Sequence, residues 1–204
     1  MAVLVALNYL TYNPATVEFM LFNVTVTMPV IVFAILVVIL VWASINVTNC
    51  ADGVDGLSGT LTIITLLTIY GIFKIKDNLG SISFLILLFC VCILGYLWYN
   101  ANPSRMLMGD AGSRAMGIFI AIAILKTGSP VLYLLVAAVL ILDGGLGLVK
   151  VALLRFLKIK ILKNTRTPLH DHTRKNMGWS GSQTVVRFAI IQIMISLATL
   201  YLIA

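Results

Sequence analysis

The sequence contains little charge: only 10% of its 204 residues are Asp, Glu, Lys or Arg. A water-soluble domain carries roughly 25% charged residues, so too few are present here to cover a surface in water. Hydrophobic residues make up 61% of the chain, and several apolar runs approach the about 20 residues that a helix needs to cross a bilayer. The shortage of charge therefore excludes a soluble globular domain and predicts an integral membrane protein.

Three further features are missing from the sequence. The N-terminus has neither the basic flank nor the small-residue cleavage site of a secretory signal. The three cysteines are odd in number and match no zinc or disulfide spacing, so we expect Cys50, Cys90 and Cys92 to be ordinary core residues. No internal repeat or domain boundary is apparent, which predicts that residues 1–204 form a single domain.

Hydropathy along the chain predicts an all-α fold, a polytopic membrane bundle of about six spans. The predicted spans are 29–48, 57–74, 82–99, 113–127, 131–157 and 185–204. Residues 1–11 look like the end of a preceding helix, which Asn13 and Pro14 terminate. Because successive loops alternate sides, 49–56, 100–112 and 158–184 are expected on one side of the membrane and 75–81 and 128–130 on the other.

Basic residues are concentrated in the last of these loops and in the helix end before it. This stretch holds half of the fourteen Lys and Arg residues: Arg155, Lys158, Lys160, Lys163, Arg166, Arg174 and Lys175. Cytoplasmic loops carry an excess of Lys and Arg, so this side is predicted to face the cytoplasm. Topology and attraction to anionic lipid headgroups would by themselves suffice to explain the run.

Acidic residues are fewer, and most lie on the same predicted side. Four of the seven share this side with both histidines: Asp52, Asp55, Asp110 and Asp171. Glu18 and Asp77 lie elsewhere, and Asp143 lies within an apolar helix. Carboxylates gathered with basic residues on one face suit a metal ion and a polyanionic ligand better than they suit a passive bundle.

The first polar motif runs Asn46-Val-Thr-Asn49-Cys-Ala-Asp52-Gly53-Val-Asp55-Gly56-Leu57. Its amides and carboxylates, three residues apart, would line one face if the helix continued through them. The glycines would then break the helix and let the backbone approach a ligand. A polar helix end with Asp-Gly turns would account for part of the pattern, but the full motif at a membrane boundary favours a binding site.

Two more motifs follow in the other loops of this side. One runs Asn100-Ala-Asn-Pro-Ser-Arg-Met-Leu-Met-Gly109-Asp110-Ala-Gly112-Ser113, and the other is Pro168-Leu-His170-Asp171-His172, followed by Gly178-Trp179. Asp110 stands just before a predicted helix. An alternative interpretation is therefore that Asp110 or Ser113 only caps this helix and has no other function. Zinc is disfavoured, because neither a cysteine nor a third histidine lies near the histidine pair.

Asp143 and Lys150 share the span 131–157 with three glycines. An acid within hydrocarbon is costly and is usually functional or paired. A spacing of seven residues puts both side chains on one helix face, so mutual neutralisation of this pair is favoured slightly over a catalytic role for Asp143. The run is longer than a straight span needs, and the glycines allow a bend.

Taken in order, these motifs and the ending Val185-Val-Arg-Phe188 resemble those of the phospho-N-acetylmuramoyl-pentapeptide transferases, a branch of the polyprenyl-phosphate N-acetylhexosamine-1-phosphate transferases. The resemblance covers essentially the whole chain. It implies Mg²⁺-dependent transfer of phospho-N-acetylmuramoyl-pentapeptide from UDP to undecaprenyl phosphate, which yields UMP and the first lipid-linked peptidoglycan precursor. It also implies a homodimer in the bacterial cytoplasmic membrane, with the active site facing the cytoplasm and no nucleic-acid partner.

The resemblance further implies roles for individual residues. Asp110 would be the magnesium ligand. The catalytic residues would be Asp52, Asp55, Asp110 and His170. The substrate-binding residues would be Asn46, Asn49, Gly53, Leu57, Asn100, Leu107, Lys150, Asp171 and His172.

The chain also departs from the family pattern. Asp171 stands where the second of three histidines is usual, and Leu107 stands where a phenylalanine would stack on uracil. Lys150 replaces a glutamine, which would alter nucleoside contacts or add a phosphate contact. Family members have about ten spans, with an aspartate pair and a lysine motif in the N-terminal part. The chain therefore looks like the last six spans, and we expect it to transfer little phospho-sugar alone.

Three other hypotheses stay open from the sequence. In the first, the chain acts on another UDP-N-acetylhexosamine. In the second, it is a truncated, non-catalytic membrane paralogue that binds nucleotide-sugar or lipid phosphate. An ion or proton pathway built on Asp143 and Lys150 is disfavoured, because it would leave the three loop motifs unexplained.

Overall fold

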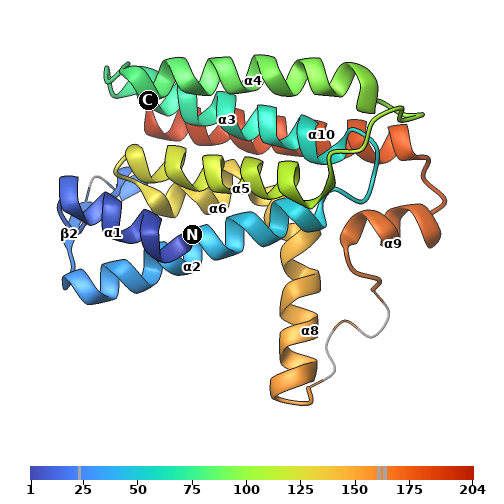
Figure 1. Cartoon of the computed structure of the whole chain (residues 1–204), viewed down its shortest axis with the longest axis horizontal. Helices are drawn as coiled ribbons and strands as arrows, with labels where there is room; N and C mark the ends of the chain where they lie inside the picture. The colour runs from blue at the N-terminus through green and yellow to red at the C-terminus, as the bar shows by residue number, and fades with distance from the viewer. Residues whose placement is uncertain (23, 160–161, 163–164) are drawn as a thin grey trace.

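The computed structural model describes residues 1–22, 24–159, 162 and 165–204, which form a bundle of helices (Figure 1). The predicted helical membrane fold is confirmed, with one small sheet at its edge. The long helices are α2 (Val30–Cys50), α3 (Leu57–Ile75), α4 (Ser81–Asn100), α5 (Gly109–Lys126) and α10 (Gly181–Ile203).

Four helices are long and apolar enough to cross a membrane, namely α2, α3, α4 and α10. A fifth span results if the two helical parts between Pro130 and Phe156, which meet at 75°, are counted as one. The remaining predicted span corresponds to α5, whose eighteen residues include Asp110, Arg114 and Lys126. The chain is thus a multi-pass membrane protein.

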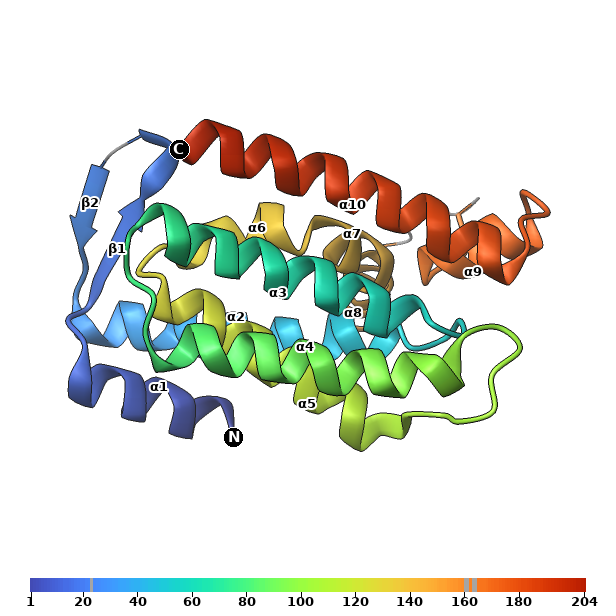
Figure 2. The same ribbon diagram turned by 90° about the horizontal axis from the view of Figure 1, so that it is seen from above.

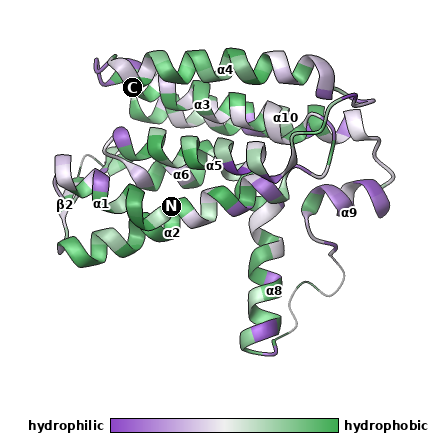
Figure 3. Ribbon diagram, in the orientation of Figure 1, coloured by the Kyte–Doolittle hydropathy of each residue, from purple (hydrophilic) through white to green (hydrophobic). Residues whose placement is uncertain are grey.

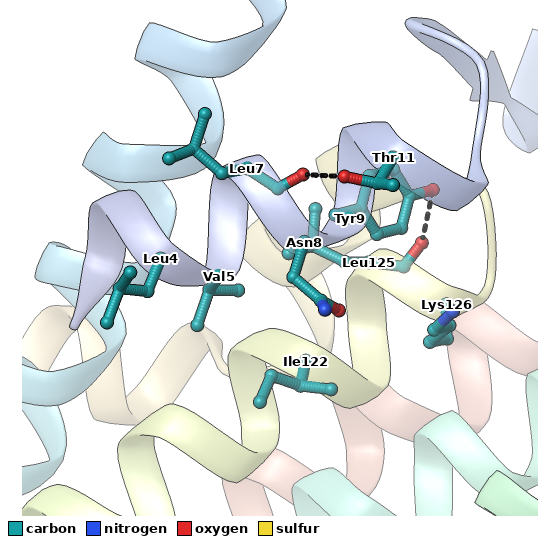
Figure 4. A pocket seen from close by; sticks show the side chains of 9 residues that line it. All are labelled: Leu4, Val5, Leu7, Asn8, Tyr9, Thr11, Ile122, Leu125 and Lys126. Atoms are coloured by element: carbon teal, nitrogen blue, oxygen red, sulfur yellow. Dashed lines mark hydrogen bonds between the residues drawn. The ribbon is translucent and has the colours of Figure 1, made fainter.

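The first helix, α1 (Ala2–Tyr12), ends at Asn13 as expected, because the residue before a proline is pushed out of helical geometry. The helix packs against α2, and the Tyr9 hydroxyl donates to the Leu125 carbonyl of α5 at 3.1 Å. An open groove of about 500 Å³ lies between α1 and α5, where Leu4, Ile122 and neighbouring side chains line it (Figure 4).

Residues after Pro14 form a feature that the sequence analysis missed, a two-stranded antiparallel hairpin. Strand β1 (Thr16–Phe19) pairs with β2 (Val24–Thr27), and the 3₁₀ turn η1 (Met20–Phe22) follows β1. Valine and threonine dominate both strands, and β-branched side chains favour extended backbone. The hairpin is fixed to neighbouring loops, because Lys76 pairs with Glu18 and also donates to the Thr127 carbonyl.

The predicted span 131–157 is broken into short pieces rather than bent smoothly. They are η2 (Pro130–Leu132), α6 (Tyr133–Val136), α7 (Ala138–Leu140), the π-helical turn η3 (Ile141–Gly145) and α8 (Leu146–Phe156). Ala137 at the break has φ −118° and ψ 23°, outside helical geometry. Helix α8 leaves the bundle, as Figure 1 shows, and none of its residues is buried.

Close backbone contacts hold α2 against α5 and the broken span. A side chain on Gly117 of α5 would come within 2.5 Å of the Ser44 carbonyl oxygen, and one on Gly144 of η3 would come equally close to that of Val47. The Ser44 hydroxyl also donates to the Gly117 carbonyl at 2.7 Å. Small residues at membrane helix crossings permit this approach, and it brings the polar end of α2 beside α5 and η3.

The polar segments gather at the end of the bundle opposite the hairpin (Figure 2). The loop expected at 158–184 contains a short helix, α9 (Leu169–Lys175), rich in hydrophilic residues (Figure 3). Two basic residues of this loop, Lys160 and Lys163, lie outside the described residues. We call this end, formed by 49–56, 100–113 and 166–184, the polar end.

Side-specific labelling tests the predicted orientation. In a background without the three native cysteines, Met177→Cys and Asn78→Cys place exposed thiols at opposite ends of the bundle. Because basic loops remain in the cytoplasm, an impermeant maleimide should label position 78 in intact cells and position 177 only after lysis. Ser129, in a loop on the same predicted side as Asn78, is fully buried, so a cysteine at this position would be unsuited to labelling. The reverse pattern would contradict the assignment.

Candidate functional site

Side chains of the first two polar motifs meet directly at the polar end. The Asn49 side-chain amide donates to Asp110 Oδ1 at 3.2 Å and lies 2.9 Å from the Ser113 hydroxyl. The other carboxylate oxygen of Asp110 accepts from Arg114 at 2.6 Å, and the Asp110 side chain is 72% exposed. Asp110 thus presents an oriented carboxylate to solvent.

The alternative in which Asp110 or Ser113 caps α5 is wrong. The N-cap position is Met108, and no side chain caps this helix terminus. Asp110 instead lies in the first turn, and the Ser113 hydroxyl donates back to the Gly109 carbonyl at 3.1 Å. A negative charge in the first turn still interacts favourably with the helix dipole.

Asp52 lies in the turn after α2, because the helix ends at Cys50 rather than continuing through the motif. Its carboxylate accepts from the Ser58 hydroxyl at 2.5 Å. Partial burial raises the pKa of Asp52 above its ordinary value; the Ser58 hydrogen bond opposes this shift, and the negative charge of Asp110 adds to it. Asp52 therefore holds a proton more readily than an exposed aspartate does.

Asn100 connects the first two loops from a buried position. Its side-chain oxygen accepts from the Gly56 backbone N–H at 2.8 Å, and its amide donates to the Met106 carbonyl at 2.7 Å. Asp55 adds a second link, since it accepts from the Ser104 backbone N–H at 3.2 Å. Asn100 is only 4% exposed, so its hydrogen bonds organise the loops rather than face a ligand.

Asp143 contacts His170, and the predicted pairing with Lys150 is wrong. The Asp143 carboxylate is fully buried and accepts from the His170 backbone N–H at 2.7 Å, while its second oxygen lies 2.8 Å from His170 Nδ1. Lys150 donates instead to the carbonyls of Leu162 and Thr165. The π-helical turn places Asp143 toward α9, whereas the regular helix assumed from the spacing would place it beside Lys150.

The ring of His170 lies against Gly53 of the first loop. A Cβ atom at Gly53 would be 2.4 Å from His170 Nε2, so the ring occupies the space that any side chain would need. Nδ1 of the ring lies against the Asp143 carboxylate, and Nε2 is the nitrogen that faces Gly53. His170 is 3% exposed, so its burial does not favour direct contact with a substrate, which the catalytic role implied by the resemblance would need.

The neighbouring residues of α9 point in other directions. His172 Nδ1 accepts weakly from the Arg166 backbone N–H at 3.4 Å, and Asp171 pairs with Lys175 at 2.8 Å. The hydrogen bond from Lys175 lowers the pKa of Asp171, a small opposing effect comes from burial, and nearby positive charges lower it further. The two histidines thus lack a common ligand position.

Three other predicted substrate-binding residues differ in exposure. Asn46 donates to the Trp42 carbonyl of its own helix at 2.7 Å. Leu57 is fully buried in the core at the start of α3, which does not favour contact with a ligand. Leu107 is 80% exposed and lines a cavity of about 330 Å³ beside Tyr96 and Met108.

The carboxylates at the polar end suit a magnesium ion whose remaining coordination positions are filled by a substrate. Within the described residues, no group of three or more His, Cys, Asp or Glu side chains is arranged to hold a metal ion. Magnesium, however, usually binds one or two carboxylates and fills its other positions with water and phosphate oxygens. The exposed Asp110 carboxylate, with Asp52 close enough to feel its charge, meets this requirement.

Sequence reasoning missed several residues that shape the site. Ser58 binds Asp52, Arg114 pairs with Asp110, and Thr173 donates to the His170 carbonyl at 2.9 Å. Arg114 was detectable, because Asp and Arg four residues apart on a helix commonly pair. The others depend on how distant segments pack.

Replacing Gly53 by alanine should disturb the Asp143–His170 contact. The new Cβ would displace the buried His170 ring, and overpacking of a buried side chain costs about 1–3 kcal/mol. The thermal unfolding midpoint in detergent should therefore fall. Gly95→Ala is the matched control, because nothing lies within 4 Å of its Cβ position. Equal stability of the two variants would contradict the contact.

Double-mutant cycles should separate the two possible partners of Asp143. Asp143→Asn combined with His170→Gln should show a coupling free energy of about 0.5–3 kcal/mol, as contacting residues do. The cycle of Asp143→Asn with Lys150→Gln should be additive, because the two side chains bind different groups. Unfolding free energies of the single and double variants provide the measurement. Coupling in the second cycle alone would restore the partner expected from the sequence.

Several known proteins are similar in sequence to this chain. Phospho-N-acetylmuramoyl-pentapeptide-transferase of Treponema pallidum subsp. pallidum is 45% identical over 187 residues, which covers 84% of this chain and 51% of that protein. The enzyme of the same name from Helicobacter hepaticus is 30% identical over 127 residues, covering 62% and 34%. That from Borrelia garinii subsp. bavariensis is 35% identical over 106 residues, covering 52% and 29%.

The chain spans about half the length of the first of these relatives and less of the others. A sequence profile described as glycosyl transferase family 4 matches residues 1–128, which is more than half of the chain. The chain therefore belongs to glycosyl transferase family 4.

Proposed function

We propose that the polar end binds the substrates of a phospho-N-acetylmuramoyl-pentapeptide transferase, which moves this group from UDP to undecaprenyl phosphate. The observation that carries the proposal is the contact between Asn49 and Asp110, which joins two distant motifs at an exposed, carboxylate-rich end of a membrane bundle. The names of the relatives support the choice of substrates.

The proposed reaction requires a site that both cytosol and lipid can reach. An oxygen of the prenyl phosphate attacks the phosphorus bonded to the sugar and forms a new P–O bond. The bond from that phosphorus to the bridging oxygen breaks, and UMP leaves with this oxygen. Both reactants are anionic, so catalysis rests on positioning and on neutralisation of charge.

The carboxylates at the polar end would divide these tasks. Asp110 would hold Mg²⁺, which when bound supplies positive charge to the diphosphate. Asn49 fixes one oxygen of Asp110 and so orients the carboxylate. Asp52, whose pKa is raised chiefly by burial, would take up a proton from the attacking phosphate. Asp55 keeps the second loop in place through the Ser104 N–H.

His170 would act as a positioning residue in this scheme. Its ring supports the backbone of Gly53, between Asn49 and Asp55, and Asp143 fixes its orientation. Lys150 would contribute charge, because its two carbonyl partners among the described residues leave one of three N–H donors for a phosphate oxygen. Arg166, next to Thr165 in the sequence, would add further attraction for the nucleotide.

An apolar groove beside the polar end would receive the prenyl chain. The groove has a volume of about 350 Å³ and lies between α2 and the broken span. Its lining includes Leu36, Ile39, Trp42, Tyr133, Leu148 and Gly145. Gly145 is adjacent in sequence to Gly144 and close to Asp143, so a chain in the groove would carry its phosphate toward the polar end.

The proposal also includes location and assembly. The basic loop supports an orientation in which the polar end lies at the cytoplasmic face of the bacterial inner membrane. UDP-linked muramoyl-pentapeptide would approach from the cytosol and undecaprenyl phosphate from the bilayer. A homodimer follows from the family resemblance.

Substitution of Asp110 tests the proposal in a full-length setting. In a chimera, residues 1–204 replace the matching half of the Treponema pallidum relative, and UMP release is measured with and without Mg²⁺. Asp110→Asn keeps the hydrogen bond from Asn49 but removes the charge, so turnover should fall by about 10²–10³, as for other electrostatic groups. Folding should survive, because Asp110 caps no helix.

Arg114→Gln is the matched control, since it removes the other partner of Asp110 and leaves the carboxylate intact. Its turnover should stay within a few-fold of the parent chimera. Normal turnover by Asp110→Asn would contradict the metal role. A chimera that accepts UDP-N-acetylglucosamine in preference to the muramoyl donor would favour another hexosamine transferase. A chimera that binds UDP-sugar without UMP release would favour a non-catalytic paralogue.

A further inference from the structure

The break in the fifth span separates two backbone groups that would normally bind each other. In a continuous α-helix, the Val139 N–H would donate to the carbonyl of Leu135, four residues earlier. The non-helical geometry of Ala137 between them prevents this contact, and the Val139 N–H donates to Gln192 Oε1 of α10 at 2.8 Å. Helix α10 runs alongside α6 and α7 in Figure 2.

The side-chain amide of Gln192 contacts backbone groups on both sides of the break. Its nitrogen lies 3.2 Å from the Leu135 carbonyl oxygen and 3.0 Å from that of Val136, while its oxygen accepts from Val139. One amide group is thus inserted between the carbonyl and the N–H that a regular helix would join. Gln192 is 0% exposed, so neither water nor a lipid headgroup can replace it, and unsatisfied backbone groups are costly in such surroundings.

Gln192 is itself fixed to the most buried helix of the bundle. Its nitrogen lies 3.2 Å from the Ser196 hydroxyl, and that hydroxyl lies 2.8 Å from the hydroxyl of Thr68 on α3. More than half of the apolar window of α3 is buried within the protein. The amide at the break is therefore held by α10 and α3 together.

The geometry of the break determines where the following turn points. Asp143 lies four residues after Val139 in η3, and its carboxylate accepts from the His170 backbone N–H and contacts His170 Nδ1. We propose that Gln192 is a positioning residue for this contact, because its amide substitutes for the missing helical hydrogen bond and so directs the π-helical turn toward α9. The functional importance rests on the role proposed for the polar end, but the positioning can be tested without catalysis.

Hydrogen exchange on the whole chain in lipid nanodiscs provides the test. Gln192→Leu keeps the approximate volume and removes every hydrogen bond of the amide. Exchange should rise about tenfold in peptides covering 137–141, and also in peptides covering 169–176, where the His170 N–H is bound to Asp143. Peptides from α3 and α4 should exchange as in the parent chain, which separates this effect from general unfolding.

Thr199→Val is the matched control, because Thr199 is buried on the same helix but its hydroxyl donates only to the Ile195 carbonyl of α10. It should leave both regions protected. If Gln192→Leu does not fold, Gln192→Asn keeps a polar amide that is too short to bridge the break and should deprotect both regions. Faster exchange at 137–141 alone would show a purely local contact and overturn the proposal, as would unchanged exchange in both regions. This measurement does not use the transfer activity of the chimera. A failure of the positioning proposal can therefore be distinguished from a failure of the proposed function.

Discussion

In the hydrocarbon core of a membrane, each backbone N–H and C=O must find its partner within the protein, because water is absent. The chain satisfies this constraint in α2, α3, α4 and α10 by regular helical hydrogen bonds. It departs from regularity at Ala137, where the Gln192 amide supplies the missing partners. Three features lie after this break in the chain: the π-helical turn, the buried Asp143 and the exit of α8 from the bundle.

The two halves of the polar end are held by different kinds of contact. Between the first two loops, Asn49 donates an exposed, charge-assisted hydrogen bond to Asp110, and the buried Asn100 accepts a neutral one from the Gly56 N–H. Between the first loop and α9, a buried carboxylate and a histidine ring packed on Gly53 define the geometry. Removal of one partner from the buried pair leaves an uncompensated polar group, which is costly. The Asp143–His170 contact should therefore be more sensitive to substitution than the exposed contact between Asn49 and Asp110.

An exposed carboxylate beside a partly buried one is a useful arrangement for a polyanionic substrate. Asp110 is open to solvent, so a cation can reach it without displacement of the bundle. Asp52 is less solvated and retains a proton more readily, because burial disfavours its charged form. The apolar groove between α2 and the broken span ends near the same turn, so lipid and aqueous approaches converge within one polar end.

The sequence by itself determined the membrane class, the positions of the five long helices within a few residues and the family, because these depend on local hydropathy and on short motifs. It also identified Asn49, Asp52 and Asp110, which lie together at the polar end. It failed on the hairpin at Thr16–Thr27, on the partner of Asp143 and on the burial of Leu57. Only the tertiary structure decided these. For the partner of Asp143, the reason is that regular helical spacing cannot anticipate a π-helical turn. The break before that turn is bridged by Gln192, a side chain 53 residues after Val139.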